Sequence, residues 1–266
     1  MSASKAADLN KTHWFFLRGL GRESAHWGDF LTRFEEGVPG SRATALDLPG
    51  FGARQAQRSP ATIAEIVDDV QEEFAQAQAG DPGRAPFLFA VSLGGMVAAE
   101  WLARSSAVSG AVLVNSSFRG WSSAFDRLKP EACGRIARIM AARTSLARER
   151  QVLGMVSNRP ETHERIAGEW ARIAEARPAG IENFLRQLLA AGRFSPNDEP
   201  PAAPILVLNS STDRMVDSSC SLEISRRWRV PLKRHPSAGH DLSLDEPDWA
   251  IRQVADWLGR MVDETP

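Results

Sequence analysis

The sequence predicts an α/β fold in which a mostly parallel sheet is covered by helices on both faces. Short apolar runs bounded by turn residues recur along the chain, and helical patterns separate most of them. The expected strands are residues 14–17, 43–46, 87–91, 111–114 and 205–208, together with a less regular run at 229–232. A chain of 266 residues is long enough for one large domain with a substantial core.

Helical spacing of apolar residues predicts helices between the strands and at the end of the chain. Over residues 62–74, one apolar stripe consists of Ile63, Ile66, Val67, Val70 and Phe74. A last helix is expected after the Asp-Glu-Pro sequence at 245–247, and its broad apolar face consists of Trp249, Val254, Trp257, Leu258 and Met261. We interpret both faces as parts of the hydrophobic core.

The alternation of strands and helices is interrupted between Phe118 and Phe194, where several helical patterns occur without a strand-like run. An all-helical block inside an α/β fold indicates an insertion at the carboxyl edge of the sheet, where such folds hold their sites. We therefore expect a core formed by residues 1–117 and 195–266, and a helical lid formed by residues 118–194. Four lid residues are candidates for lining a site, although each also fits packing between helices: Trp121, Met140, Met155 and Phe184.

A serine lies at a sharp turn between a predicted strand and a predicted helix. Ser92 follows the apolar run 85–91, and the small residues Ala90 and Gly94 lie two positions to either side of it. Such a nucleophile elbow exposes the serine hydroxyl, and it needs small neighbours because the strand and the helix pass close together. The pattern predicts that Ser92 is a catalytic nucleophile.

A nucleophilic serine needs an imidazole base and a carboxylate that orients the imidazole. His240 follows the last predicted strand, so we expect it above the carboxyl edge of the sheet, whereas the other four histidines fit structural or solvated positions. Asp213 lies in the turn after the strand at 205–208 and is the expected orienting acid. Asp217 is the alternative, although it also fits the N-cap of the next helix. The chain order Ser92, Asp213, His240 is typical of this elbow.

Two backbone N–H groups are expected to form an oxyanion hole, which stabilises the negative charge of a tetrahedral intermediate. The first belongs to Leu93, directly after the nucleophile. The second should come from the loop after the first strand, where Gly19 and Gly21 allow the backbone to turn toward the site. Leu20, between these glycines, is the expected second donor.

Together these motifs resemble the α/β-hydrolase superfamily, and within it the branch of small esterases with a lid. The matching segments are R-G-L-G (18–21), D-L-P-G-F-G (47–52), A-V-S-L-G-G-M (90–96), S-T-D-R-M-V (211–216) and A-G-H-D-L (238–242). The resemblance implies a sheet of about six mostly parallel strands in the order 4-3-5-6-7-8 of the family's labelling. It also implies a serine carboxylic-ester hydrolase of the EC 3.1.1 type, which acts through an acyl-enzyme on a small or medium acyl ester and needs no metal or organic cofactor.

The chain departs from the family pattern at the oxyanion loop, where Arg18 and Gly19 replace the usual His-Gly. The backbone donor at Leu20 is unaffected by this change. We expect Arg18 to pair with a nearby carboxylate such as Asp47, and a guanidinium at this place could instead bind an anionic substrate.

Other activities of the same fold remain open. An acyl-carrier-protein or CoA hydrolase, acting on a methyl ester or a thioester, would use the same residues. A non-catalytic small-molecule binder and a cofactor-free lyase or perhydrolase are further alternatives. Haloalkane dehalogenases and epoxide hydrolases are excluded, since they need an aspartate in place of Ser92.

The balance of charge and the apolar runs limit the partners. The chain has 32 basic and 33 acidic residues, so it lacks the excess of positive charge that binding to nucleic acid requires. Its two cysteines and its short apolar runs predict a cytoplasmic protein without a membrane partner.

The predicted lid is more basic than the rest of the chain, with 14 Lys or Arg against 8 Asp or Glu. Most of the excess comes from Arg127, Lys129, Arg135, Arg138, Arg143, Arg148, Arg150 and Arg159. A solvated surface is the simpler explanation, and a docking face for an anionic carrier protein or a CoA ester is the alternative.

Overall fold

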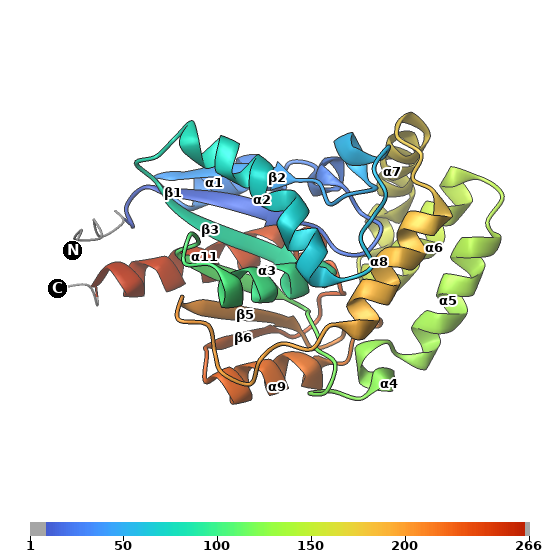
Figure 1. Cartoon of the computed structure of the whole chain (residues 1–266). Coiled ribbons are helices and arrows are strands. Elements are labelled where there is room, and N and C mark those ends of the chain that lie inside the picture. The colour runs from blue at the N-terminus through green and yellow to red at the C-terminus, as the bar shows by residue number, and fades with distance from the viewer. Residues whose placement is uncertain (1–8, 264–266) are drawn as a thin grey trace.

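A parallel sheet forms the centre of the computed structural model, which describes residues 9–263 (Figure 1). The described residues form six strands: β1 (Thr12–Leu17), β2 (Ser41–Leu46), β3 (Ala85–Val91), β4 (Gly110–Val114), β5 (Ile205–Ser210) and β6 (Leu232–His235). Their order in the sheet is β2-β1-β3-β4-β5-β6, and every neighbouring pair is parallel. This confirms the expected fold class and strand order.

The expected last strand at residues 229–232 was wrong, since β6 begins only at Leu232. Arg229 adopts a left-handed conformation with φ 54° and ends the preceding helix, so the backbone cannot extend there. The strand that follows has Lys233 and Arg234 at its centre and contains no apolar run. An edge strand of this composition leaves no apolar pattern in the sequence.

Helices cover both faces of the sheet, as the alternation of side chains along β1 requires. Phe15 and Leu17 point to one face, where they pack with α2 (Ile63–Ala79), α3 (Leu93–Arg104) and α9 (Ser218–Trp228). Trp14 and Phe16 point to the other face, where they pack with α1 (Phe30–Gly37) and α11 (Pro247–Asp263). All four β1 side chains are fully buried, because a central parallel strand is covered on both sides.

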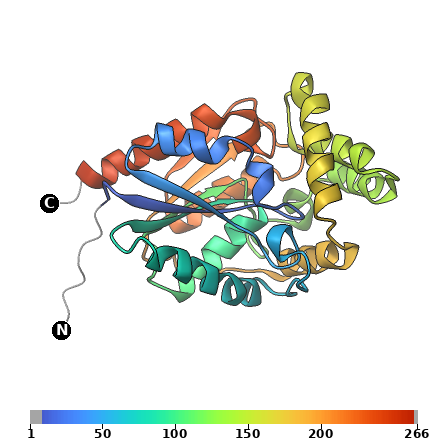
Figure 2. The ribbon, with the colours of Figure 1, turned by 90° about the horizontal axis from the view of Figure 1, so that it is seen from above.

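The chain between β4 and β5 contains only helices among its regular elements, and we call it the helical segment. It comprises α4 (Ala124–Arg127), α5 (Pro130–Ala141), α6 (Ser145–Val156), the short turn η3 (Pro160–Thr162), α7 (His163–Ala176) and α8 (Ile181–Arg193). Figures 1 and 2 show it at one end of the sheet. Its small core includes Val152, Leu153, Ile166 and Trp170, which are buried between α6 and α7. No helix within residues 9–263 is long and apolar enough to cross a membrane.

Candidate active site

Ser92 is the single residue between the end of β3 and the start of α3, and its backbone is strained. Its φ of 56° and ψ of −113° lie in a region that a residue with a side chain rarely adopts. Bonds on both sides hold this conformation: the Ser92 N–H donates to the Val114 carbonyl at 2.8 Å, and the Gly95 N–H donates to the Ser92 carbonyl at 3.0 Å. A strained residue held in this way has a side chain with a fixed direction.

Two glycines after Ser92 are required by close contacts. A Cβ atom on Gly94 would lie 2.5 Å from the carbonyl oxygen of Leu17 and 2.8 Å from that of Arg18. A Cβ atom on Gly95 would lie 1.9 Å from the hydroxyl of Ser116. The start of α3 therefore passes directly against the end of β1, which is the physical reason for the small residues in the elbow motif.

The structure brings Asp213 and His240 together in a hydrogen bond of 2.7 Å between Oδ2 of Asp213 and Nδ1 of His240. The other carboxylate oxygen of Asp213 accepts the N–H groups of Met215 at 2.7 Å and Val216 at 3.0 Å. Both partners are buried, with Asp213 in the loop after β5 and His240 in the loop after β6. Because Asp213 accepts the proton on Nδ1, the neutral imidazole presents Nε2 as a proton acceptor.

The surroundings of His240 raise its pKa above the usual value. Burial by itself would lower the pKa, but the charge and the hydrogen bond of Asp213 outweigh burial, and Asp241 adds to them. The imidazolium form is therefore stabilised at this position, as a general base requires after it takes a proton.

Asp217, the alternative acid, is the N-cap of α9. Its carboxylate accepts the Ser219 N–H at 3.0 Å and pairs with Lys129 at 3.1 Å. Both contacts explain why the pKa of Asp217 is lowered, with the backbone hydrogen bond from Ser219 as the largest cause. In this structure Asp213, and not Asp217, contacts the imidazole.

The loop that contains Leu20 passes against Ser92. A Cβ atom built on Gly19 would lie 3.2 Å from the Ser92 Cβ and 3.8 Å from its hydroxyl oxygen. Leu93 is the first residue of α3, so its N–H has no partner inside the helix. Among the hydrogen bonds of residues 9–263, neither the Leu20 N–H nor the Leu93 N–H donates to another group. Both N–H groups are thus unused within the described part of the chain, in two segments that meet at Ser92.

A buried glutamine of the helical segment supports the same loop. Gln187, on α8, accepts the Gly21 N–H at 3.0 Å through its side-chain oxygen, and it is fully buried. Sequence reasoning missed this contact, because a single polar residue on an amphipathic helix gives no signal of a distant backbone partner.

Arg18 pairs with Asp241, and the expected pairing with Asp47 was wrong. The two side chains form a bidentate ion pair, one contact being 3.3 Å, and each is 5% exposed. The guanidinium also lies over the ring of Trp27, 4.6 Å from its centre. Asp47 instead accepts the backbone N–H groups of Ser24 and Ala53, at 2.6 and 2.8 Å. Asp241 directly follows His240, so the pair joins the loop after β1 to the loop after β6.

Burial disfavours the ionised form of Asp241, and the ion pair with Arg18 offsets this effect. Burial by itself would raise the pKa of Asp241, but the charge of Arg18 and its hydrogen bond outweigh burial and lower the pKa. A hydrogen bond from the Ser243 hydroxyl, at 2.7 Å, acts in the same direction.

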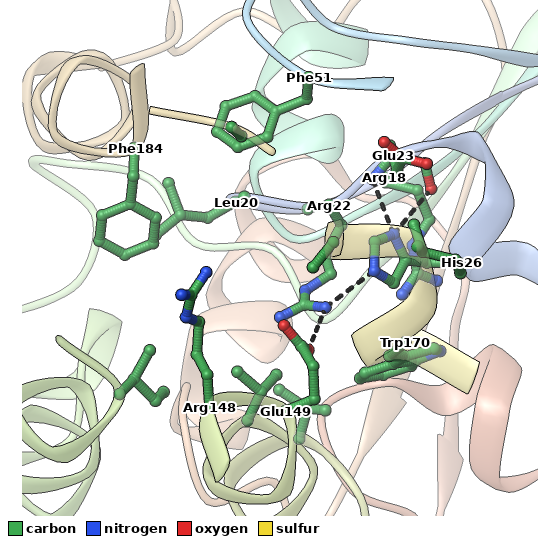
Figure 3. Close-up of a pocket in the computed structure, with 18 of the residues that line it drawn as sticks. Arg18, Leu20, Arg22, Glu23, His26, Phe51, Arg148, Glu149, Trp170 and Phe184 are labelled. Carbon is green, nitrogen blue, oxygen red and sulfur yellow. Dashed lines mark hydrogen bonds and ion pairs between the residues drawn. The ribbon is translucent and has the colours of Figure 1, made fainter. Parts of the chain in front are cut away.

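Ion pairs also fasten the helical segment to the loop after β1. Arg22 pairs with the buried Glu149 of α6 at 2.7 Å, and its guanidinium lies over the Trp170 ring of α7 at 4.8 Å (Figure 3). Glu23, which is also buried, pairs with Arg177 just after α7. The residues next to Leu20 are therefore held by contacts from α6 and α7.

Ser157 and Asn158, in the junction between α6 and η3, reach the loops of Asp213 and His240. Asp245 accepts the Ser157 hydroxyl at 2.6 Å, the Asn158 N–H at 2.8 Å and the Gly239 N–H at 2.7 Å. The Asn158 amide donates to the backbone carbonyls of Thr212 at 3.1 Å and Ser237 at 3.2 Å. Thr212 directly precedes Asp213, and Gly239 directly precedes His240. The junction thus binds both loops at once.

A cavity of about 610 Å³ lies between the sheet and the helical segment. Ser92, His240 and Leu20 line it from the sheet side, and Met140, Met155 and Phe184 line it from the helical segment. Trp121, the fourth candidate, packs instead against Trp228 and Phe118. The volume is in the range of small-molecule sites. Within residues 9–263, no group of three or more His, Cys, Asp or Glu side chains could hold a metal ion.

Comparison with known proteins supports the fold and places the chain in a family. The model of the alpha/beta hydrolase family matches residues 14–253. No curated protein matches the chain. Among solved structures, an esterase from Exiguobacterium antarcticum is similar with a TM-score of 0.74 at 15% identity, and the match covers 94% of this chain and 92% of that one.

Two further solved structures are similar over nearly their whole length. The esterase RhEst1 from Rhodococcus sp. ECU1013 has a TM-score of 0.71 at 18% identity, with 95% of this chain and 92% of that one covered. A lipase-esterase related protein from Clostridium acetobutylicum has a TM-score of 0.71 at 15% identity, with 94% and 96% covered. At these identities the likeness shows the shared fold.

Proposed function

Because the chain belongs to the alpha/beta hydrolase family, we propose that it is a serine carboxylic-ester hydrolase that acts through an acyl-enzyme. One observation carries this proposal: the strained Ser92 and the buried His240 line the same cavity, and His240 is hydrogen-bonded to Asp213. A hydroxyl, an imidazole and a carboxylate in this relation are the parts that nucleophilic acyl transfer needs.

In the proposed reaction, the Ser92 hydroxyl oxygen attacks the acyl carbonyl and Nε2 of His240 takes the hydroxyl proton. Asp213 stabilises the imidazolium, and the N–H groups of Leu20 and Leu93 bind the oxyanion. The intermediate collapses, and His240 gives the proton to the leaving alcohol. A water molecule then attacks the acyl-enzyme while His240 takes its proton. His240 gives this proton to the Ser92 oxygen as the acid is released.

In the proposal the helical segment acts as a lid that forms one wall of the acyl site. The cavity residues from this segment are mainly apolar, as Met140, Met155 and Phe184 illustrate. Apolar walls of this kind suit a small or medium acyl group, because binding removes its surface from water.

The experiment that tests the proposal compares Ser92→Ala with Ser237→Ala, an exposed serine in the loop of His240. The substrates are methyl, p-nitrophenyl and thioesters of graded acyl length, and a fluorophosphonate probe reports the reactive serine. We expect Ser92→Ala to lose both turnover and labelling while Ser237→Ala keeps them. Turnover of Ser92→Ala within about tenfold of the wild type would contradict the proposal, since the residues of a triad act as a unit.

The same experiment separates the other activities of this fold. A non-catalytic binder would not react with the probe, whereas a lyase or perhydrolase would be labelled at Ser92 and would leave simple esters intact. Ester hydrolysis that depends on both Ser92 and His240 supports the esterase over these alternatives.

A second candidate is a hydrolase for an acyl group on an anionic carrier, which is either a carrier protein or CoA. The specific observation concerns the basic residues of the helical segment. Arg127, Lys129, Arg150 and Arg159 bind a backbone carbonyl or a carboxylate. Arg135 and Arg138 on α5 have no carboxylate partner among the described residues, and Arg138 is exposed. Their charge is available to an anionic partner.

The second candidate is tested with the double variant Arg135→Glu/Arg138→Glu, at low and high salt. We expect a lower kcat/KM for a carrier-bound or CoA ester and no change for a small neutral ester. The difference should shrink at high salt, because screening weakens steering between exposed charges. Equal effects on all substrates would rule out the docking role.

A further inference from the structure

Several charged side chains line the cavity, and most of them neutralise one another. Eight such residues line the cavity: Arg18, Arg22, Glu23, Arg148, Glu149, Glu175, Arg177 and Asp241. Three ion pairs, described above, use six of the eight: Arg18 with Asp241, Arg22 with Glu149, and Arg177 with Glu23. The pairs leave one cation, Arg148, and one anion, Glu175.

Arg148 differs from the other three arginines because it has no partner among the described residues. No hydrogen bond or ion pair joins its guanidinium to another residue within 9–263, although the side chain is half-buried. Figure 3 shows Arg148 reaching from α6 into the cavity, with its guanidinium on the side of Leu20 and Phe184. The neighbouring carboxylate of Glu149 is already bound to Arg22.

The surroundings of Arg148 favour an anionic ligand. Phe51, Phe184 and Met140 line the same cavity, and their side chains offer the guanidinium of Arg148 no hydrogen-bond acceptor. An oxygen atom of a ligand would therefore replace the water that the guanidinium gives up in the cavity. Glu175 is exposed and therefore keeps its own hydration. A guanidinium presents parallel N–H donors that match the two oxygens of a carboxylate. The positive charge of the guanidinium and the negative charge of the carboxylate then cancel.

We infer that Arg148 binds a free carboxylate of the substrate, so that the preferred substrates are half-esters of dicarboxylic acids. The esterified carboxyl group lies at Ser92, the free carboxylate lies at Arg148, and the carbon chain between them contacts the apolar wall. This inference rests on the proposed esterase function for the position of the ester, and it adds the class of acid that the site selects.

The first test measures binding without turnover, by calorimetry with the Ser92→Ala protein. The ligands are monoethyl esters of straight-chain dicarboxylic acids of graded length, each beside the neutral ethyl ester of a monocarboxylic acid with the same chain. We expect the half-ester of the best length to bind about ten- to a hundredfold more tightly than its neutral counterpart, as a charged hydrogen-bonded pair provides. Arg148→Met should remove this preference, and Arg148→Lys should keep only part of it.

The matched control is Arg193→Met, which removes another arginine of the helical segment that has no ion pair with any of residues 9–263. Arg193 is exposed at the end of α8 and lies outside the cavity, so its removal should leave the preference unchanged. The second test measures kcat/KM for both ester series in the wild type and in Arg148→Met. The ratio between half-ester and neutral ester should fall about ten- to a hundredfold in Arg148→Met.

The outcomes separate the inference from the proposed function. Half-esters that bind no more tightly than neutral esters, or a preference that survives Arg148→Met, would overturn the inference even if Ser92 hydrolyses both series. Binding that depends on Arg148, without hydrolysis of any ester by the wild type, would uphold the carboxylate site and overturn the esterase.

Discussion

Removing the positive charge of Arg18 should destabilise the protein strongly, because it leaves the carboxylate of Asp241 buried without its cation. In the variant Arg18→Met, the aliphatic part of the side chain is retained and the ion pair is lost. Both side chains of this pair are 5% exposed, so water does little to screen the remaining charge. Breaking a buried pair by removing one partner costs about 3–5 kcal/mol.

The contacts that remain place the expected loss near the lower end of this range. Asp241 keeps the hydroxyl of Ser243 at 2.7 Å and the N–H of Leu244 at 3.3 Å. We therefore expect Arg18→Met to lower the free energy of unfolding by about 3 kcal/mol at neutral pH. The exposed pair of Arg33 and Asp248 provides the control, since Arg33→Met should cost no more than about 1 kcal/mol.

The loss should also depend on pH in a defined direction. In the wild type the pKa of Asp241 is lowered, so this group contributes stability above its unfolded pKa, and the contribution is lost as pH falls through the folded pKa. Without Arg18, burial raises the pKa of Asp241, and the variant loses stability as pH rises. The difference between the two proteins should therefore shrink as pH falls from neutral toward about 4, the pKa of an unfolded aspartate.

Urea denaturation of the wild type, Arg18→Met, Asp241→Asn and the double variant measures these energies. Asp241→Asn removes the charge and keeps a similar shape, so the double variant should cost clearly less than the sum of the two single variants. An Arg18→Met protein as stable as Arg33→Met, or a double variant equal to the sum, would show that the pair does not hold the two loops together.

Four further predictions concern the site. Asp213→Asn should reduce kcat by about 10⁴-fold by favouring the wrong imidazole tautomer, and steady-state kinetics would detect it; retention of most activity would contradict the role of Asp213. Asp217→Asn should change stability by no more than about 1 kcal/mol, because Asn caps a helix about as well as Asp and the pair with Lys129 is partly exposed. It should leave turnover within severalfold of the wild type, as denaturation and kinetics on one sample would show. Because the pKa of His240 is raised, kcat/KM should begin to fall on the acidic side at a higher pH than an ordinary histidine would give, and a pH profile of kcat/KM would measure this. An acidic limb at or below the pH of an ordinary histidine would contradict the prediction. Gly94→Ala should yield little folded protein, since its Cβ would meet the Leu17 carbonyl at 2.5 Å; a normal circular dichroism spectrum and melting temperature would refute this.

The sequence predicted most of the fold because its signals are local. Apolar runs and turns located five of the six described strands, and only the polar edge strand Leu232–His235 was misplaced. The positions of Ser92, Asp213 and His240 at the ends of strands followed from the same signals, and the structure places Asp213 in contact with His240. Their catalytic roles remain predictions.

The contacts of Arg18, Arg22 and Gln187 could not be predicted in the same way. Arg18 and its partner are 223 positions apart, and the contacts of Arg22 with Glu149 and of Gly21 with Gln187 span 127 and 166 positions. Which acid meets which arginine depends on how the helical segment packs on the sheet. Periodicity in one chain carries no information about that packing.

The junction at Ser157 and Asn158 sets a limit on how the helical segment could be exchanged. A chimera that replaces residues 118–194 with the corresponding part of a relative would also remove Ser157 and Asn158, and with them the hydrogen bonds to Asp245, Thr212 and Ser237 that support the loops of Asp213 and His240. Such a chimera should turn over even small esters slowly, because the loops of Asp213 and His240 lose this support. Changing the substrate specificity by grafting a relative's helices should succeed only when Ser157 and Asn158 are kept.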